Sequence, residues 1–295
     1  MQKEVSNAVA KVESAREAGE SAHFWQAHEA VPSINADELF HVGPFTVANS
    51  TMFIFLTIFL FLIAIIYARK FKLIPNYFQH MCEMFYEGIL GLLSQIVGDR
   101  AHAEKILPVA GAIFTYILLS NLLTMLPGLS SFTYTPMING VAGEAVPIFR
   151  GGTADFNTTF GLALASVLFI QYIGIKEKGM TGHLSHFIQI KGIANAFKGQ
   201  KSVGQRAGEL GTGVIHFLVG LIEIIGEFAK VISLSLRLFG NMFAHEILTI
   251  IIMGSFAILL PVIWMGMGII VGIVQAIVFT SLITVYYTLV LKKEH

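Results

Sequence analysis

Cysteine and charged residues are both scarce in this chain of 295 residues. Cys82 is its one cysteine, so the sequence allows no internal disulfide and no cysteine cluster that would bind a metal ion. Charged residues make up 13% of the chain, roughly half the fraction in a typical soluble domain. The formal net charge is zero, which gives no sign of nucleic-acid binding.

Motifs for hydrolytic or nucleotide chemistry are missing as well. The ten histidines are scattered without the spacing of metal ligands. His245-Glu246 begins like a zinc-hydrolase motif, but Thr249 stands where the second histidine is required. The sequence has no glycine-rich phosphate-binding loop that ends in Gly-Lys-Ser or Gly-Lys-Thr. We therefore expect no catalysis by this chain alone, no cofactor and no metal.

Long apolar runs are the main positive feature. The chain is 55% hydrophobic and has a mean hydropathy of +0.70. A helix of about 20 apolar residues crosses a hydrocarbon core of about 30 Å. We expect an all-α integral membrane protein with about five spanning helices, one interfacial amphipathic helix, and a long, strongly tilted helix pair at the C-terminal end. The expected spans are residues 50–68, 106–126, 158–175, 213–253 and 258–291.

Three segments outside the spans have a different character. Residues 1–47 hold seven acids and three bases and predict a soluble N-terminal arm, followed by a membrane domain over residues 48–295. Asn76–Val97 carries two glutamates among apolar residues, which predicts an amphipathic helix near the membrane interface. Residues 176–206 hold six Lys or Arg and one Glu, and we expect a basic cytoplasmic connector there.

The distribution of Lys and Arg predicts the orientation. Five crossings with the N-terminus outside place thirteen basic residues on the inner side and four on the outer side. Loops rich in Lys and Arg stay in the cytoplasm. We therefore expect the N-terminus outside and the C-terminus in the cytoplasm.

The fourth expected span is unusual because it contains charged side chains. Ionisable residues inside a span are costly, so they indicate function. Its polar residues follow at separations of 4, 3, 7, 4 and 4, which places them on one broad helical face: Glu223, Glu227, Lys230, Arg237, Asn241 and His245. Glu227 can pair with Lys230 one turn later. Arg237 has no acid three or four residues away, and its guanidinium stays charged, so we expect an acid from another helix or another subunit.

The run from Ser233 to Glu246 carries a specific order of residues. A leucine-flanked Arg237 is followed by Phe239-Gly240-Asn241 and then by Glu246, nine residues after the arginine. This order closely resembles the signature of subunit a of the F-type ATP synthase. Three further segments also resemble parts of that family: Asn121–Pro127, Asp155–Asn157 and Gln275–Phe279. The resemblance covers about residues 50–291 and is poor over 1–47 and 180–210.

The resemblance implies a proton-conducting stator subunit with two offset half-channels beside a c-ring. Arg237 would face the ring, and Glu223 would lie on the inner half-channel. The outer half-channel would contain Asn241, His245, Glu246 and Gln275. Asn121 would add a polar contact near the outer path, although a hydrogen bond between two helices explains it equally well. The implied partners are the c-ring, peripheral-stalk b subunits and the lipid bilayer of the bacterial inner (plasma) membrane.

Two departures from the family pattern concern the outer half-channel. Thr124 stands where some members have an acid. Gly268 stands where some members have a histidine, and His245 where those members have a small residue. This indicates an exchange of side chains across two packed helices, or else a His245 that only hydrogen-bonds its neighbours. The alternative function is a stand-alone secondary transporter or ion channel, against which the lack of a visible internal repeat counts.

Overall fold

The computed structural model describes most of the chain. The described residues are 36–42, 45–68, 71–72, 75–126, 128–129, 132–135, 137–138, 141–142, 146–187, 203–255 and 259–292. Helices dominate this part, and its strands occur only as short two-stranded pairs. The expected N-terminal arm lies largely outside the described residues.

A β-hairpin leads into the first long helix. β1 (Glu38–Val42) pairs antiparallel with β2 (Phe45–Ala48), and α2 (Asn49–Ala68) follows directly. The Asn49 backbone N–H donates to the Asp37 carbonyl at 3.0 Å, and its side-chain amide donates to the Asp37 carboxylate at 3.2 Å. These two bonds tie the start of α2 to the residue before the hairpin. α2 coincides within one residue with the first expected span.

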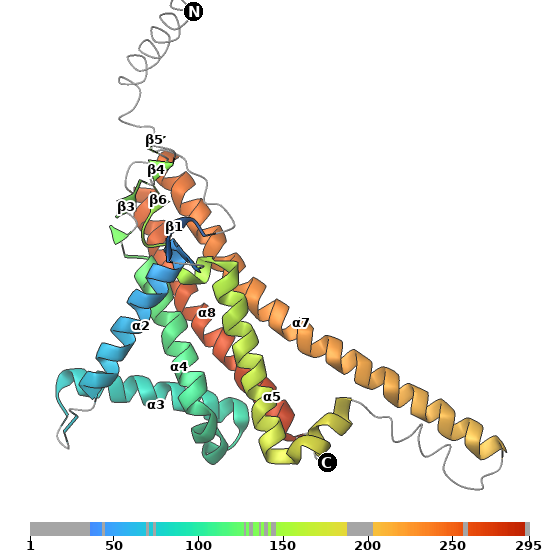
Figure 1. Cartoon of the computed structure of the whole chain (residues 1–295). Helices are drawn as coiled ribbons and strands as arrows, with labels where there is room; N and C mark the ends of the chain where they lie inside the picture. Colours follow the sequence, from blue (N-terminus) through green and yellow to red (C-terminus); the bar gives the residue numbers. More distant parts are fainter. Residues whose placement is uncertain are drawn as a thin grey trace, which may run out of the picture.

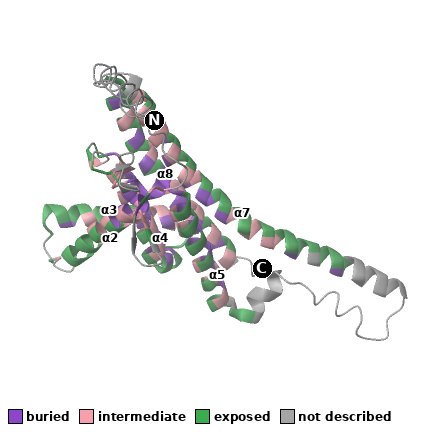
Figure 2. Cartoon of the chain, turned by 45° about the horizontal axis from the view of Figure 1, so that its top comes forward, coloured by how far each residue is buried: buried purple, intermediate pink, exposed green. Residues whose placement is uncertain are grey.

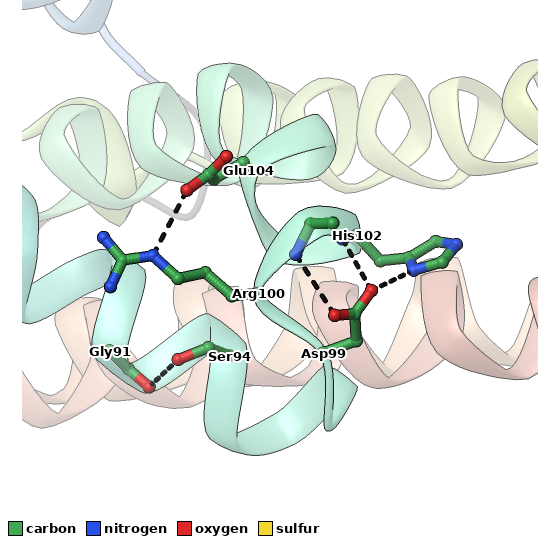
Figure 3. Close-up of polar contacts among 7 residues, drawn as sticks. Gly91, Ser94, Asp99, Arg100, His102 and Glu104 are labelled. Atoms are coloured by element: carbon green, nitrogen blue, oxygen red, sulfur yellow. Dashed lines mark hydrogen bonds and ion pairs between the residues drawn. The ribbon is translucent and has the colours of Figure 1, made fainter.

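Two capping residues define the corner between the next two helices. α3 (Tyr77–Val97) ends at Gly98, whose φ of 81° suits glycine and whose N–H donates to the Ser94 carbonyl. The Asp99 carboxylate then accepts hydrogen bonds from the N–H groups of Ala101 and His102 (Figure 3). The His102 ring and these N–H groups lower the pKa of Asp99.

The Asp99 cap explains a difference from the expected second span. α4 covers Arg100–Thr124, so it begins six residues before residue 106. An N-cap aspartate satisfies backbone donors of the first turn. The helix can therefore begin in the polar residues 100–105, before the apolar run starts. Figure 1 shows α3 lying across the direction of α4, which is the arrangement expected of a helix at the membrane interface.

The segment between α4 and the next long helix contains short strands. β3 (Thr133–Tyr134) pairs with β6 (Val146–Pro147), and β4 (Met137–Ile138) pairs with β5 (Val141–Ala142). The 3-10 helix η2 (Gly152–Ala154) follows and packs against α2, α4, α5 and α7. This segment therefore reaches the centre of the helix bundle.

α5 (Phe156–Phe187) contains the third expected span and continues into the basic segment. Asp155 precedes it and accepts hydrogen bonds from the Asn157 N–H and the Thr158 hydroxyl, and also from Ser50 of α2 at 2.8 Å. Gly179, with φ of 74°, interrupts the helical conformation after the apolar part. The expected connector 176–206 is thus helical up to Phe187, apart from the interruption at Gly179, and its last residues, from Val203, belong to the next helix.

Two very long helices complete the chain. α7 (Val203–Ser255) has 53 residues and α8 (Leu259–Lys292) has 34. A helix of 53 residues is about 80 Å long, far more than a perpendicular span requires. Figure 1 shows α7 running obliquely, with its C-terminal half beside α8 and its N-terminal half apart from the other helices. The side chains of Val214, Ile215, Leu218 and Ile222 in that half are exposed (Figure 2).

The buried core lies where α3, α4, α5, α7 and α8 meet. Its large side chains interdigitate across these helices, and the most completely buried are Leu93, Ile106, Ile117, Ile170, Leu234, Leu238, Phe279, Ile283 and Tyr287. Most apolar side chains of α2, in contrast, are exposed. This distribution is typical of a membrane protein, whose outer apolar surface faces lipid or other subunits.

Four helices in the described part of the chain are long and apolar enough to cross a membrane: Asn49–Ala68, Arg100–Thr124, Phe156–Glu177 and Leu259–Leu291. The sequence led us to expect about five crossings. The expected crossing that is not among these four lies in α7, which carries several charged side chains. In Figure 1, α2, α4 and α5 extend from the level of the hairpin toward the lower side of the view, whereas α7 and α8 also continue above the hairpin. The end of α8 lies on the side away from the hairpin, near the lower ends of α4 and α5.

This path yields a topology prediction. A cysteine introduced at Glu38 should react with impermeant thiol reagents added outside, and a cysteine at His295 only with reagents added inside. Cys82 is first replaced by serine, so that the introduced thiol is the only one. Labelling of intact cells and of inverted vesicles measures both. A cysteine at residue 295 that reacts from outside would contradict the orientation.

Candidate functional site

Asn121 joins three elements at the buried centre of the bundle. Its side-chain amide donates to the Gly272 carbonyl of α8 at 3.1 Å, and its oxygen accepts from the Thr153 hydroxyl of η2 at 2.9 Å. A Cβ on Gly272 would lie 3.0 Å from the Asn121 Cβ, so the close approach of α4 and α8 depends on this glycine. The hydrogen bond between two helices, one of the two explanations that the sequence left open for Asn121, is therefore present.

Asn241 and Gln275 form an amide pair between α7 and α8. The Asn241 Nδ2 donates to the Gln275 Oε1 at 2.7 Å. Gln275 is buried, and its Nε2 has no hydrogen-bond partner among the described residues. Asn241 is exposed on the other side of the contact. The pair thus connects a polar group inside the bundle to the surface of α7.

Glu246 is held by a residue that sequence reasoning missed. The Arg150 Nε lies 3.2 Å from Oε1 and 3.3 Å from Oε2 of Glu246. The side chain of Arg150 is 2% exposed, and that of Glu246 is 23% exposed. The Arg150 guanidinium also lies over the Phe243 ring, 6.0 Å from its centroid. Before the structure, Arg150 counted only as one of the outer basic residues.

His245 packs directly against α8. Its ring stacks on Trp264 with centroids 5.2 Å apart, and the Trp264 Nε1 donates to the Thr249 hydroxyl at 3.1 Å. A Cβ on Gly268 would lie 2.4 Å from the His245 Cε1, which is far inside van der Waals contact. A side chain at residue 268 would force the His245 ring and the Met125 sulfur to move. The two positions of the expected exchange are therefore neighbours in space.

Arg237 lies one helical turn before Asn241 and is half-buried. No acid forms an ion pair with it in the part of the chain that the structure describes. It borders a row of exposed positions on α7, here called the outer stripe, which contains Ala229, Ser233, Leu236, Gly240 and Ala244. Small residues dominate this row and permit another helix to approach closely.

A second charged group lies toward the N-terminal half of α7. The Lys230 ammonium pairs with the Glu227 carboxylate at 2.5 Å, as expected for residues three apart, and lies over the Tyr286 ring of α8 at 4.9 Å. Glu223 lies one turn further from Arg237 and is half-buried. Arg237 thus separates two polar groups: Glu223, Glu227 and Lys230 on one side, and Asn241, His245 and Glu246 on the other.

Comparisons with known proteins give consistent matches over most of the chain. Residues 50–288 match the family model described as ATP synthase A chain. The ATP synthase subunit a of Moorella thermoacetica is 31% identical over 250 residues, which cover 84% of this chain and 93% of that protein. The subunit of the same name from Geotalea daltonii is 30% identical over 252 residues, covering 84% and 90%. That from Citrifermentans bemidjiense is 28% identical over 264 residues, covering 88% and 95%.

Proposed function

Because the chain belongs to the ATP synthase A chain family, we propose that it is the proton-conducting stator subunit of a rotary ATP synthase. It forms two offset half-channels beside a c-ring, with Arg237 between them. It is a multi-pass protein of the bacterial inner membrane and assembles with the c-ring and peripheral-stalk b subunits. It is not catalytic alone.

The observation that carries this proposal is that Arg237 has no carboxylate partner within the described residues. A guanidinium keeps its charge at any physiological pH, and a charge within a membrane requires a partner or water. Within the described residues no carboxylate meets Arg237, and the outer stripe beside it is uncovered. A carboxyl group on a neighbouring subunit that passes along this stripe supplies the missing partner.

The two polar groups along α7 support separate water paths. Glu223 and Glu246 are 23 residues apart, or about 34 Å along a helix. Arg237 lies between them. In the group near Glu246, Asn241 bonds to α8 and Glu246 pairs with the loop before η2. In the group near Glu223, Lys230 contacts Tyr286, closer to the C-terminal end of α8. Two offset half-channels fit this placement, whereas one straight pore would leak protons.

The separation has a direct consequence for rotation. During synthesis a ring carboxyl loses its proton to the inner path near Glu223 and passes Arg237 as a carboxylate. It then regains a proton from the outer path near Glu246. A bare carboxylate in a low-dielectric medium is costly by several kcal/mol, and an adjacent positive charge lowers that cost. The same charge repels protons that would cross directly between the paths.

A stand-alone secondary transporter or ion channel is the alternative. Such a protein would have to supply its own acid opposite Arg237, and the described residues contain none in contact with it. Purification distinguishes the two functions, because a stator subunit copurifies with a c-ring and a peripheral stalk.

Accessibility measurements test the two paths. In a chain whose Cys82 is replaced by serine, cysteines at Glu246, Asn241 and Gln275 should react with silver ions or small thiol reagents from the outside. A cysteine at Glu223 should react from the inside. The control is Phe59→Cys, on the exposed face of α2, which should be protected from water-borne reagents by lipid. Reaction of residues 223 and 246 from the same side would contradict the proposal.

A further inference from the structure

Arg150 is a buried arginine in a loop, whereas most loop arginines are exposed. It lies in the segment before η2, and residues 150–155 are all buried. Arginine is almost never fully buried unless it is paired. Its Nε contacts both oxygens of Glu246, and Phe243, one turn earlier on α7, lies beneath the guanidinium. Packing and charge together therefore fix the Arg150 side chain against this part of α7.

The exposure of the two partners is unequal. Glu246 retains 23% of its side-chain exposure, and Arg150 retains 2%. The carboxylate is partly open at the surface of the subunit, whereas the arginine approaches it from the protein interior. Because Arg150 cannot release its proton, it remains positively charged throughout any protonation of Glu246.

Two further ionisable groups lie near the pair. Asp37, before β1, is close enough for its charge to act on Glu246, and the Asn49 amide holds it in place. His245 precedes Glu246, but its ring faces Trp264 and Gly268 on α8. Arg150 is thus the nearest described cation to Glu246 and contacts it directly.

We propose that Arg150 is a positioning residue of the outer path: it holds the Glu246 carboxylate in place and sets the pH at which that carboxylate takes up a proton. The significance for transport rests on the proposed function, whereas the charge coupling itself does not. A proton from outside converts the carboxylate to a carboxylic acid and weakens the ion pair. Loss of that proton toward the ring restores both the carboxylate and the pair.

The test is an infrared titration of the complete, lipid-reconstituted complex. The carboxyl band of Glu246 is identified by its loss in Glu246→Gln. In Arg150→Gln, the pH midpoint of the titration of this band should rise by about one unit or more. The reason is that the variant removes an opposite charge that favours the ionised form of Glu246. Arg100→Gln is the matched control, since Arg100 is exposed and pairs only with Glu104 on the surface. Its midpoint should equal that of the wild type.

Arg150→Lys keeps the titration informative if Arg150→Gln assembles poorly. Lysine retains the charge but lacks the planar fork, so we expect a smaller shift in the same direction. The double variant Arg150→Gln with Glu246→Gln should assemble better than Arg150→Gln alone, because it leaves no unpaired buried charge. An unchanged midpoint in both Arg150→Gln and Arg150→Lys would overturn the inference.

Proton pumping against outer pH separates this inference from the proposed function. If the pumping profile shifts together with the infrared midpoint, both are supported. If the midpoint shifts and the pumping profile does not, Arg150 still controls the protonation of Glu246. In that case the placement of Glu246 on the outer path is wrong.

Discussion

Arg237→Ala should abolish ATP-coupled proton transport while the complex still assembles. In the proposed mechanism, the variant removes the positive charge that stabilises a ring carboxylate between the two paths. It also removes the barrier to direct proton flow, so the membrane sector should become passively leaky. Assembly should persist because the Arg237 side chain is half-buried and forms no ion pair within the described residues. ATP-driven pumping and passive proton flux in vesicles measure the two effects.

Arg237→Lys and Arg100→Ala serve as comparisons for this variant. Lysine retains the charge but not the planar fork, so it should block the leak better than it supports synthesis. Arg100→Ala removes an exposed arginine at the start of α4 and should pump normally. Near-normal pumping by Arg237→Ala would refute the proposed role of this arginine.

Gly268→His should block transport through a steric conflict. Even a Cβ at residue 268 would lie 2.4 Å from the His245 ring and 2.7 Å from the Met125 sulfur. Overpacking a tight contact costs about 1–3 kcal/mol or more, and here it also separates α7 from α8. Combining Gly268→His with His245→Gly should restore packing and part of the transport, because the imidazole then reaches the same space from α8. Pumping rates of the two single variants and the double variant measure this.

An alanine pair controls for the helical backbone. Gly266→Ala and Gly268→Ala both gain helix propensity, but a Cβ at residue 266 meets nothing within 4 Å. Gly266→Ala should therefore pump like the wild type, and Gly268→Ala should be impaired.

If the double variant of Gly268→His and His245→Gly is no better than Gly268→His alone, the exchange of side chains is not functional.

The sequence predicted the long helices well because their apolar runs are almost uninterrupted. The bounds of α2, α3 and α8 differ from the expected ranges by at most one residue at each end. The start of α4 was placed too late because its first turn is polar, and a capping aspartate does not change hydropathy. The hairpin of β1 and β2 was missed because its strands are too short to show a clear alternation.

Some contacts of the candidate site could likewise be predicted from the sequence, and others could not. The spacing along α7 identified Glu227 and Lys230 as able to pair, because both residues lie on one helix, and the structure contains this pair. The motif around Arg237 pointed to Asn241 and Gln275, which form the amide pair of α7 and α8. Arg150 could not be found, since 96 residues separate it from Glu246 and no local pattern connects a loop to a distant helix.

The contact of Asn121 with Gly272 has a mechanical meaning for a stator. Under the proposed function, a turning ring exerts a tangential load on α7, and α7 can transmit force only if its support does not slide. That load passes to α8 through the amide pair, and from α8 to α4 through the close approach at Gly272. The Thr153 hydroxyl then ties α4 to η2, which also packs against α2 and α5. In the proposed stator, a few short polar contacts thereby distribute the reaction torque over five helices, and the two proposed water paths keep their alignment while the ring moves.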